Sequence, residues 1–254
     1  MIRISNFPVI LAVLSLLAMW LAGRIGCYIR EKRMARRGPP SSDFNIALTA
    51  TLTLLALIIG FSFSLAMSRY DQRRNYEEAE ANAIGTEYLR VDVLPAADAA
   101  KIKSLLERYT DLRISYYRSR PGAALNQINA ETAQLQDQLW RAVAVPASAP
   151  PTPVSALTIA GMNDVLNSQG YTQAAWWYRI PREAWILMVV IALYANFLMG
   201  FGAEGPRTNS LLLVLPFLVS ISFLLIADID SPRGGLIRLN PVNLIALAQS
   251  LHGH

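Results

Sequence analysis

Four long apolar stretches occur along this chain. They are arranged as two closely spaced pairs, with a long charged segment between the pairs. They cover residues 7–29, 44–67, 184–201 and 210–227. Each has about the 20 residues that a helix needs to cross the hydrocarbon core of a bilayer. The pattern predicts an all-α polytopic membrane protein with four transmembrane helices. We expect residues 1–67 and 183–227 to form the two transmembrane pairs.

The segment between the pairs, residues 68–182, has the periodicity of helices that pack together in water. The second span continues without proline beyond the bilayer until Pro95 ends it. Further helices are expected at 96–119, 123–143 and 154–168, separated by a Pro-Gly turn and by an extended proline-rich linker at 144–153. No part of this segment alternates as a strand would. We expect 68–182 to be a helical extramembrane insert.

The last stretch, residues 228–254, is expected to be a C-terminal tail. It opens with Asp228, Asp230, Pro232 and Arg233, a composition typical of a turn that stops the fourth helix. The alternative for these residues is a contact with a neighbouring helix or subunit. Both histidines of the chain lie at its end, where we expect them in solvent.

Charge is distributed unevenly between the segments, although the whole chain carries only +5. Basic residues gather in the connector between the first two spans, namely Arg24, Arg30, Lys32, Arg33, Arg36 and Arg37. Such a run between spans is typical of a cytoplasmic loop rather than a nucleic-acid site. This predicts a multi-pass protein of the cell inner membrane with a periplasmic N-terminus and insert. Three arginines after the second span, Arg69, Arg73 and Arg74, favour the opposite orientation.

Chemistry-bearing motifs are missing from the sequence. It has one cysteine and two histidines, no phosphate-cradling glycine loop and no nucleophile beside a base. We therefore expect neither an enzyme nor a metal or other cofactor. The spans carry no ionisable residue well inside the apolar stretches, which disfavours proton-coupled transport.

The second span has a small and polar stripe beside a bulkier row. At about 100° per residue, the stripe occupies a sector of about 80°, and it consists of Thr49, Thr53, Ala56, Gly60 and Ser64. Small residues at such spacing serve close helix packing in lipid or line a pore around a symmetry axis. The bulky row, repeated by symmetry, would form an apolar constriction that gates by dewetting. Its members include Leu55, Ile59 and Phe63.

Aromatic and basic residues gather at 176–185, with Trp176, Trp177, Tyr178 and Trp185 among them. Amphipathic rings favour the headgroup level of a bilayer. We expect this segment to mark the point where the chain re-enters the membrane. The alternative is a solvent-facing aromatic patch that binds a ligand.

Two stretches resemble the signature of a bacterial family of membrane proteins called bestrophin-like: residues 61–70 leading into 80–90, and residues 228–238. Bestrophins are pentameric anion channels with four spans per subunit, an apolar neck on the second helix and a large helical domain. The resemblance implies a neck at Leu55, Ile59 and Phe63, and a vestibule lined by Arg69, Arg73 and Asn82. The chain lacks the acidic run of the bestrophin calcium clasp. The bestrophin domain is also cytoplasmic, opposite to the orientation that the charges predict.

The sequence thus favours an oligomeric ion channel, anion-conducting and most simply a pentamer, whose partners are the lipid bilayer and inorganic ions. A non-conducting membrane sensor or scaffold, whose insert binds a ligand or a partner, is the first alternative. A cation channel is the second, because Glu77, Glu78 and Glu80 would form acidic rings if that face of the helix met the axis.

Overall fold

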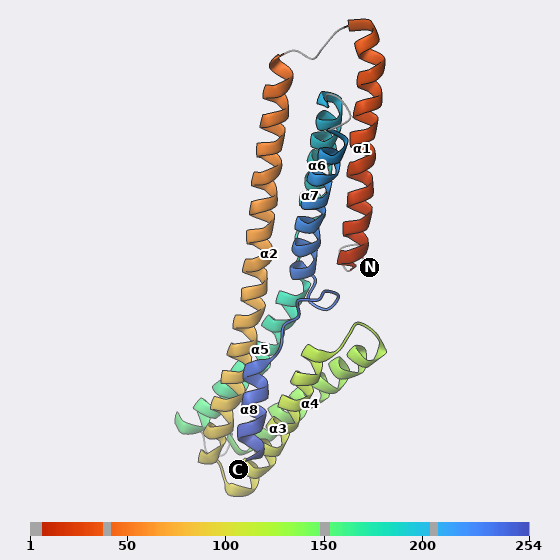
Figure 1. Ribbon diagram of the computed structural model, residues 1–254. Helices are drawn as coiled ribbons and strands as arrows, with labels where there is room; N and C mark the ends of the chain where they lie inside the picture. Colours follow the sequence, from red (N-terminus) through yellow and green to blue (C-terminus); the bar gives the residue numbers. More distant parts are fainter. Residues whose placement is uncertain (1–6, 38–41, 148–152, 204–207, 254) are drawn as a thin grey trace. The chain divides into compact units, whose positions relative to one another are not determined.

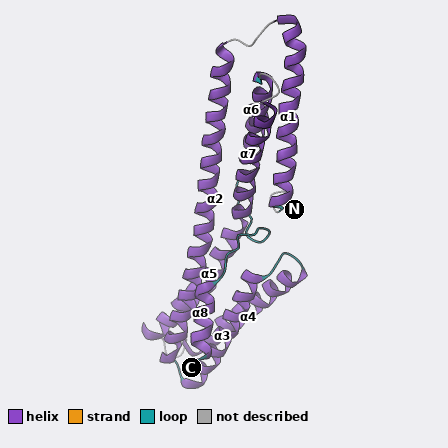
Figure 2. Ribbon diagram, viewed as in Figure 1, coloured by secondary structure: helices purple, strands orange, loops and turns teal. Residues whose placement is uncertain are grey.

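The computed structural model describes residues 7–37, 42–147, 153–203 and 208–253, and within them it contains helices and no strand (Figure 2). Figure 1 labels the elements. In chain order the helices are α1 (Pro8–Arg37), α2 (Ser42–Arg90), α3 (Ala96–Arg118), α4 (Ala123–Ala147), α5 (Pro153–Trp177), α6 (Arg182–Gly202), α7 (Thr208–Asp230) and α8 (Val242–His252). A 3-10 turn, Val91–Val93, follows α2. The all-α prediction is confirmed.

The chain divides into two compact units. The transmembrane unit takes residues 1–68 and 179–237, and the insert unit takes 69–178 and 238–254. Among the described residues, four helical segments are long and apolar enough to cross a membrane, namely Pro8–Lys32, Asp43–Val93, Ser155–Gly202 and Leu212–Asp230. Each overlaps one of the four apolar stretches of the sequence, and the second and third extend well beyond theirs. Helix α2 contributes to both units, as the uninterrupted run to Pro95 predicted.

In the transmembrane unit, α1 packs along α6 and α7 (Figure 1). Glycines bring the backbones of α1 and α6 together. A Cβ on Gly26 would overlap the carbonyl oxygen of Phe197 and lie 2.8 Å from the Phe201 nitrogen. A Cβ on Gly200 would overlap the backbone of Gly23. Small residues allow this approach, which maximises van der Waals contact where lipid supplies no hydrophobic driving force.

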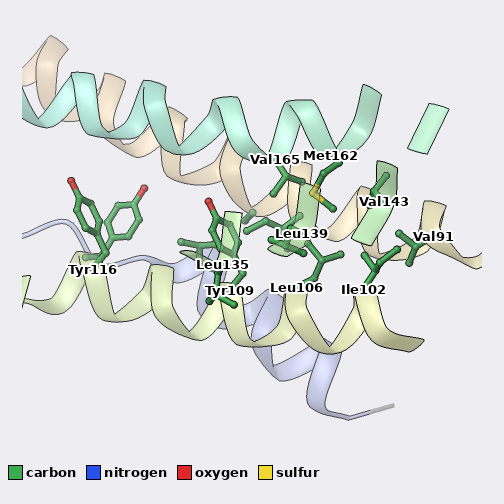
Figure 3. Packing of buried hydrophobic residues seen from close by; sticks show 14 of the residues in the cluster. Val91, Ile102, Leu106, Tyr109, Tyr116, Leu135, Leu139, Val143, Met162 and Val165 are labelled. Carbon is green, nitrogen blue, oxygen red and sulfur yellow. The ribbon is translucent and has the colours of Figure 1, made fainter. Parts of the chain in front are cut away.

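The core of the insert unit lies between α3, α4 and α5, with the end of α2 and α8 packed against it (Figure 3). Its apolar side chains recur every three or four residues, so each helix buries one face. On α3 these are Ile102, Leu106 and Tyr109, and on α4 they are Leu135, Leu139 and Val143.

Part of the segment predicted as an extended linker, 144–153, is helical. Helix α4 continues to Ala147 and α5 begins at Pro153, while residues 148–152 lie outside the described part of the chain. Val143, the last residue of the predicted helix, is fully buried, and α4 continues four residues beyond it. Helix α5 also runs nine residues past the predicted end at 168, because Thr172 and Trp176 continue its buried face.

Trp176 corrects the predicted aromatic belt. Its side chain is buried, and its ring packs edge-on against Tyr116 and Tyr117 at centroid distances of 5.5 Å. It belongs to the insert core rather than to the headgroup level. Trp177 and Tyr178 are exposed, as an interfacial role requires, and Trp185 packs on Phe223.

Helix α8 was not predicted within 228–254. It buries Leu244, Ala248 and Leu251, a spacing of four and three residues that gives one apolar face. His252 ends this helix, and its Nε2 lies 3.5 Å from the Asp111 carboxylate. His252 is exposed to solvent as expected, with 52% of its side chain exposed, but it belongs to a packed helix rather than to an unstructured tail. His254 lies outside the described residues.

Candidate functional site: helix α2

The membrane part of α2 has three faces. Leu55, Ser62 and Ala66 are buried and lie on one side. A second face, about 80° to 180° around the helix from Leu55, carries exposed bulky apolar residues, namely Ile46, Leu54, Leu57, Phe61 and Leu65. The small and polar stripe lies between them, within the sector of about 80° that the helical period assigns to it.

Every residue of the stripe (Thr49, Thr53, Ala56, Gly60 and Ser64) is exposed. A Cβ placed on Gly60 would meet no atom within 4 Å. The hydroxyl of Thr53 donates to the Thr49 carbonyl oxygen of its own helix at 2.9 Å. The stripe therefore does not serve close packing between the described helices of the transmembrane unit.

The bulky row borders a cavity between α2 and α7. The cavity has a volume of about 630 Å³. Its α2 wall is lined by Leu52, Leu55, Ile59 and Phe63 together with Ala56 and Gly60 of the stripe. Opposite them stand Leu215, Val219, Ser222, Leu225 and Ile226. The three predicted neck residues differ in solvent exposure: Leu55 is 2% exposed, Ile59 is half-buried and Phe63 is 42% exposed.

The turn after α7 is held by its two aspartates. Asp228 accepts backbone N–H groups from Leu236 at 2.6 Å and Ile237 at 2.7 Å. Asp230 accepts the N–H of Ile180 at 3.0 Å. A Cβ on Gly235 would lie 2.6 Å from the Asp228 carboxylate, so the glycine leaves room for this bonding. These bonds explain the acidic and glycine residues of the turn without a ligand.

Beyond the span, α2 buries charged residues that the sequence suggested were in water. Arg73, Glu77, Glu80 and Glu87 are each at most 2% exposed. Their spacing of four, three and seven residues continues the buried face of the span into the insert. The sequence indicated this burial only through the helical spacing, which puts the four residues on the buried face of the span. Their charge argued against burial, because a charged residue is rarely buried unless it is paired.

Glu80 is the centre of the largest of these interactions. Its carboxylate accepts from Arg113 Nε, from the Tyr117 hydroxyl at 3.1 Å and from the Thr172 hydroxyl at 3.0 Å. The Arg113 guanidinium also lies 4.3 Å from the centroid of the Tyr116 ring. Burial by itself lowers the pKa of Arg113, but the Glu80 carboxylate outweighs it and the pKa is raised. The network joins α2, α3 and α5.

Glu77 caps α8. Its carboxylate accepts the Leu244 N–H at 2.9 Å and the Asn243 side-chain amide at 2.7 Å. The residue before α8 is Pro241, which has no side-chain cap, so the carboxylate of α2 satisfies the free N–H at this helix end.

These contacts change two predictions from the sequence. Glu77 and Glu80 are engaged inside the insert unit and do not form acidic rings, which leaves Glu78 as the exposed carboxylate of the three. Among the vestibule candidates, Asn82 is exposed and Arg69 is half-buried, but Arg73 is buried. Arg73 therefore does not line an open vestibule within a single chain.

A family model described as the Bestrophin-like domain matches residues 9–244. The chain belongs to this family. Within this Bestrophin-like chain, the stretch 80–90 supplies the contacts of α2 with the rest of the insert: Glu80 bonds α3 and α5, and a Cβ on Gly85 would lie 3.1 Å from Leu247 of α8. The stretch 228–238 forms the turn after α7.

Solved structures share its fold. A bacterial Bestrophin homologue from Klebsiella pneumoniae is 16% identical, with 95% of this chain and 97% of that chain covered and a TM-score of 0.71. A variant of that homologue with one substitution has the same identity and coverage and a TM-score of 0.70. A further structure described as a membrane protein is 15% identical over the same shares, with a TM-score of 0.71. None of the curated proteins matches the chain.

Proposed function

We propose that this chain assembles with copies of itself into an ion channel of the bacterial inner membrane, with α2 at the symmetry axis. The observation that carries the proposal is the exposure of the small and polar stripe along the whole membrane part of α2. Bestrophins, which the family resembles, are pentameric channels, and a pentamer is the proposed state here.

The distribution of residues around α2 supports this placement. Its exposed bulky face suits contact with lipid or with a neighbouring subunit, because apolar side chains pay no free-energy penalty in these apolar surroundings. Its stripe of hydroxyl-bearing and small residues suits a water-filled pore on the symmetry axis, because small side chains leave the pore widest. Packing of the stripe against another copy is the competing arrangement, and it would close the axis.

Phe63 is the proposed constriction. Of the three neck candidates it is the most exposed in a single chain, so it is the one free to meet its symmetry copies. Leu55 and Ile59 are proposed to support it from the cavity beside α7. Rings of apolar side chains gate by dewetting, since water leaves a narrow apolar passage.

Anion selectivity is proposed over cation selectivity. The acidic residues that would favour cations, Glu77 and Glu80, are bonded inside the insert. Arg69 and Arg74 follow the span and leave positive charge near its end. Asn82 is proposed as a polar vestibule residue.

Reconstitution tests the function directly. Purified protein is expected to migrate as a closed oligomer and to pass chloride when incorporated in liposomes, with a reversal potential that follows the anion gradient. A potential that follows the cation gradient would favour the cation channel. A monomer that passes neither would favour the sensor or scaffold.

Phe63→Ala is expected to increase the ion flux several-fold, because it removes the ring that narrows the axis. The matched control is Phe61→Ala on the same helix, about 160° away around the axis and 71% exposed on the bulky face. Flux measured in liposomes should change for Phe63 and not for Phe61. Equal ion flux through Phe63→Ala and the wild type would contradict the assignment of Phe63 to the neck.

Orientation is tested at Ser104, which is exposed on α3. In a Cys27→Ser background, Ser104→Cys is expected to react with a membrane-impermeant thiol reagent added to whole spheroplasts, because the connector charges favour a periplasmic insert. Reaction only after lysis would assign the insert to the cytoplasm, as in bestrophins.

A further inference from the structure

The carboxyl group of Glu87 is fully buried and has no hydrogen-bond partner among the described residues at either oxygen. It lies on α2, one turn before that helix ends at Arg90. An ionised carboxylate in such a place lacks both water and donors, which makes its charge costly. The neutral acid avoids this cost.

Glu87 faces α5 at Gly161. A Cβ on Gly161 would overlap the Glu87 carboxyl and lie 2.6 Å from Arg90 Nη1. Gly161 itself is buried. The tip of the Glu87 side chain therefore lies directly against the α5 backbone at Gly161, with the Arg90 guanidinium beside it.

Two charged groups act on Glu87 from the elements around it. Arg90 on α2 favours its ionised form, and Asp164 on α5 disfavours it. Asp92, in the 3-10 turn that follows, is bonded to Lys103 at 2.6 Å. Burial outweighs the attraction of Arg90 and raises the pKa of Glu87 from 4.5 to about 8.

We infer that the Glu87 carboxyl is a proton-binding site that holds α5 against α2 while protonated and loosens this contact when it ionises. Ionisation draws water and donors toward the carboxylate, and Gly161 leaves no room for them unless α5 moves. Because α2 is continuous with the membrane span, the site sits on the same helix as the proposed pore residues. The inference concerns the insert alone and does not require conduction.

The direction of the pH effect follows from the raised pKa. The closed contact favours the protonated acid, so stability is unaffected by this group below pH 4.5, is lost progressively as the pH rises, and reaches its lowest value above about pH 8. An opening that exposes Glu87 to water is expected to become about 100-fold more favourable between pH 6 and pH 9.

Hydrogen–deuterium exchange of the full-length protein in detergent measures this opening in α5 peptides around Gly161. Wild type and Glu87→Gln are compared at each pH, so that the intrinsic pH dependence of exchange cancels. Wild-type exchange should rise about 100-fold relative to the variant between pH 6 and pH 9. The control is Glu78→Gln, an exposed glutamate of the same helix, which should behave as wild type.

Parallel exchange of wild type and Glu87→Gln across this range would overturn the inference. If the glutamine variant does not fold, Glu87→Met supplies a second neutral side chain of similar length. Wild-type protein labelled with ¹³C at glutamate carboxyls provides a measurement without substitution. One carboxyl should titrate near pH 8, and the absence of any that titrates above pH 6 would also overturn it.

Discussion

Arg113→Met is expected to destabilise the insert by about 3–5 kcal/mol, the largest single effect among the substitutions considered. The substitution removes the charged partner of Glu80 and leaves a buried carboxylate with only the hydroxyls of Tyr117 and Thr172. The free-energy cost of one buried charge without its counter-charge is much larger than the net stabilisation that the intact pair contributes. Thermal unfolding of the purified protein, followed by circular dichroism, measures the loss.

Two further variants separate this explanation from a simple loss of packing. The double replacement of Glu80 and Arg113 by methionine removes both charges and should recover most of the stability. Asp92→Asn breaks the Lys103–Asp92 pair, which is largely exposed on the aspartate side, and should cost less than about 1 kcal/mol. A double variant no more stable than Arg113→Met would mean that the charge of Glu80 is not the cause.

Gly26→Ala is expected to destabilise the transmembrane unit by about 3 kcal/mol, at the upper end of the usual cost of overpacking. The added methyl group meets the backbone of α6 at Phe197 and Phe201. Backbone atoms cannot rotate aside as a side chain can, so α1 and α6 must separate along their contact. The measurement is the thermal midpoint and the yield of folded protein in mild detergent.

The matched control is Gly170→Ala on α5, an exposed helical glycine around which a Cβ meets nothing within 4 Å. Alanine has a higher helix propensity than glycine by up to about 1 kcal/mol, so this variant should be neutral or slightly more stable. Equal thermal midpoints for Gly26→Ala and the wild type would show that α1 and α6 do not approach as closely as described.

Local patterns predicted most of the helices. The ends of α3 agree with prediction to within one residue, since Pro95 precedes it and Pro121-Gly122 follows it. Helix α5 was predicted nine residues too short, because its last turns are kept helical by the burial of Thr172 and Trp176 rather than by their propensities. Helix α8 has a clear apolar face, but it was not predicted because the turn residues before it led us to assign the whole segment 228–254 to a tail.

The candidate site was predictable only on the membrane part of α2. The small and polar stripe follows from helical period alone, and its placement at a pore axis stays a prediction. The buried charges beyond the span were not predictable, because a run of arginine and glutamate on a helix is more often solvated. Glu80 and Glu77 become core residues through Thr172 and Leu244, which lie 92 and 167 positions away.

The four membrane segments, the helical insert and the continuity of α2 between them could all be predicted from the amino-acid sequence. These properties depend on apolar length, helical period and the positions of proline, all of which act over a few turns. The fold establishes which face of α2 is covered and which charges are paired, and it leaves the Glu87 carboxyl without a hydrogen-bond donor among the described residues. The physical reason is that burial and pairing depend on neighbours that the fold brings from distant parts of the chain.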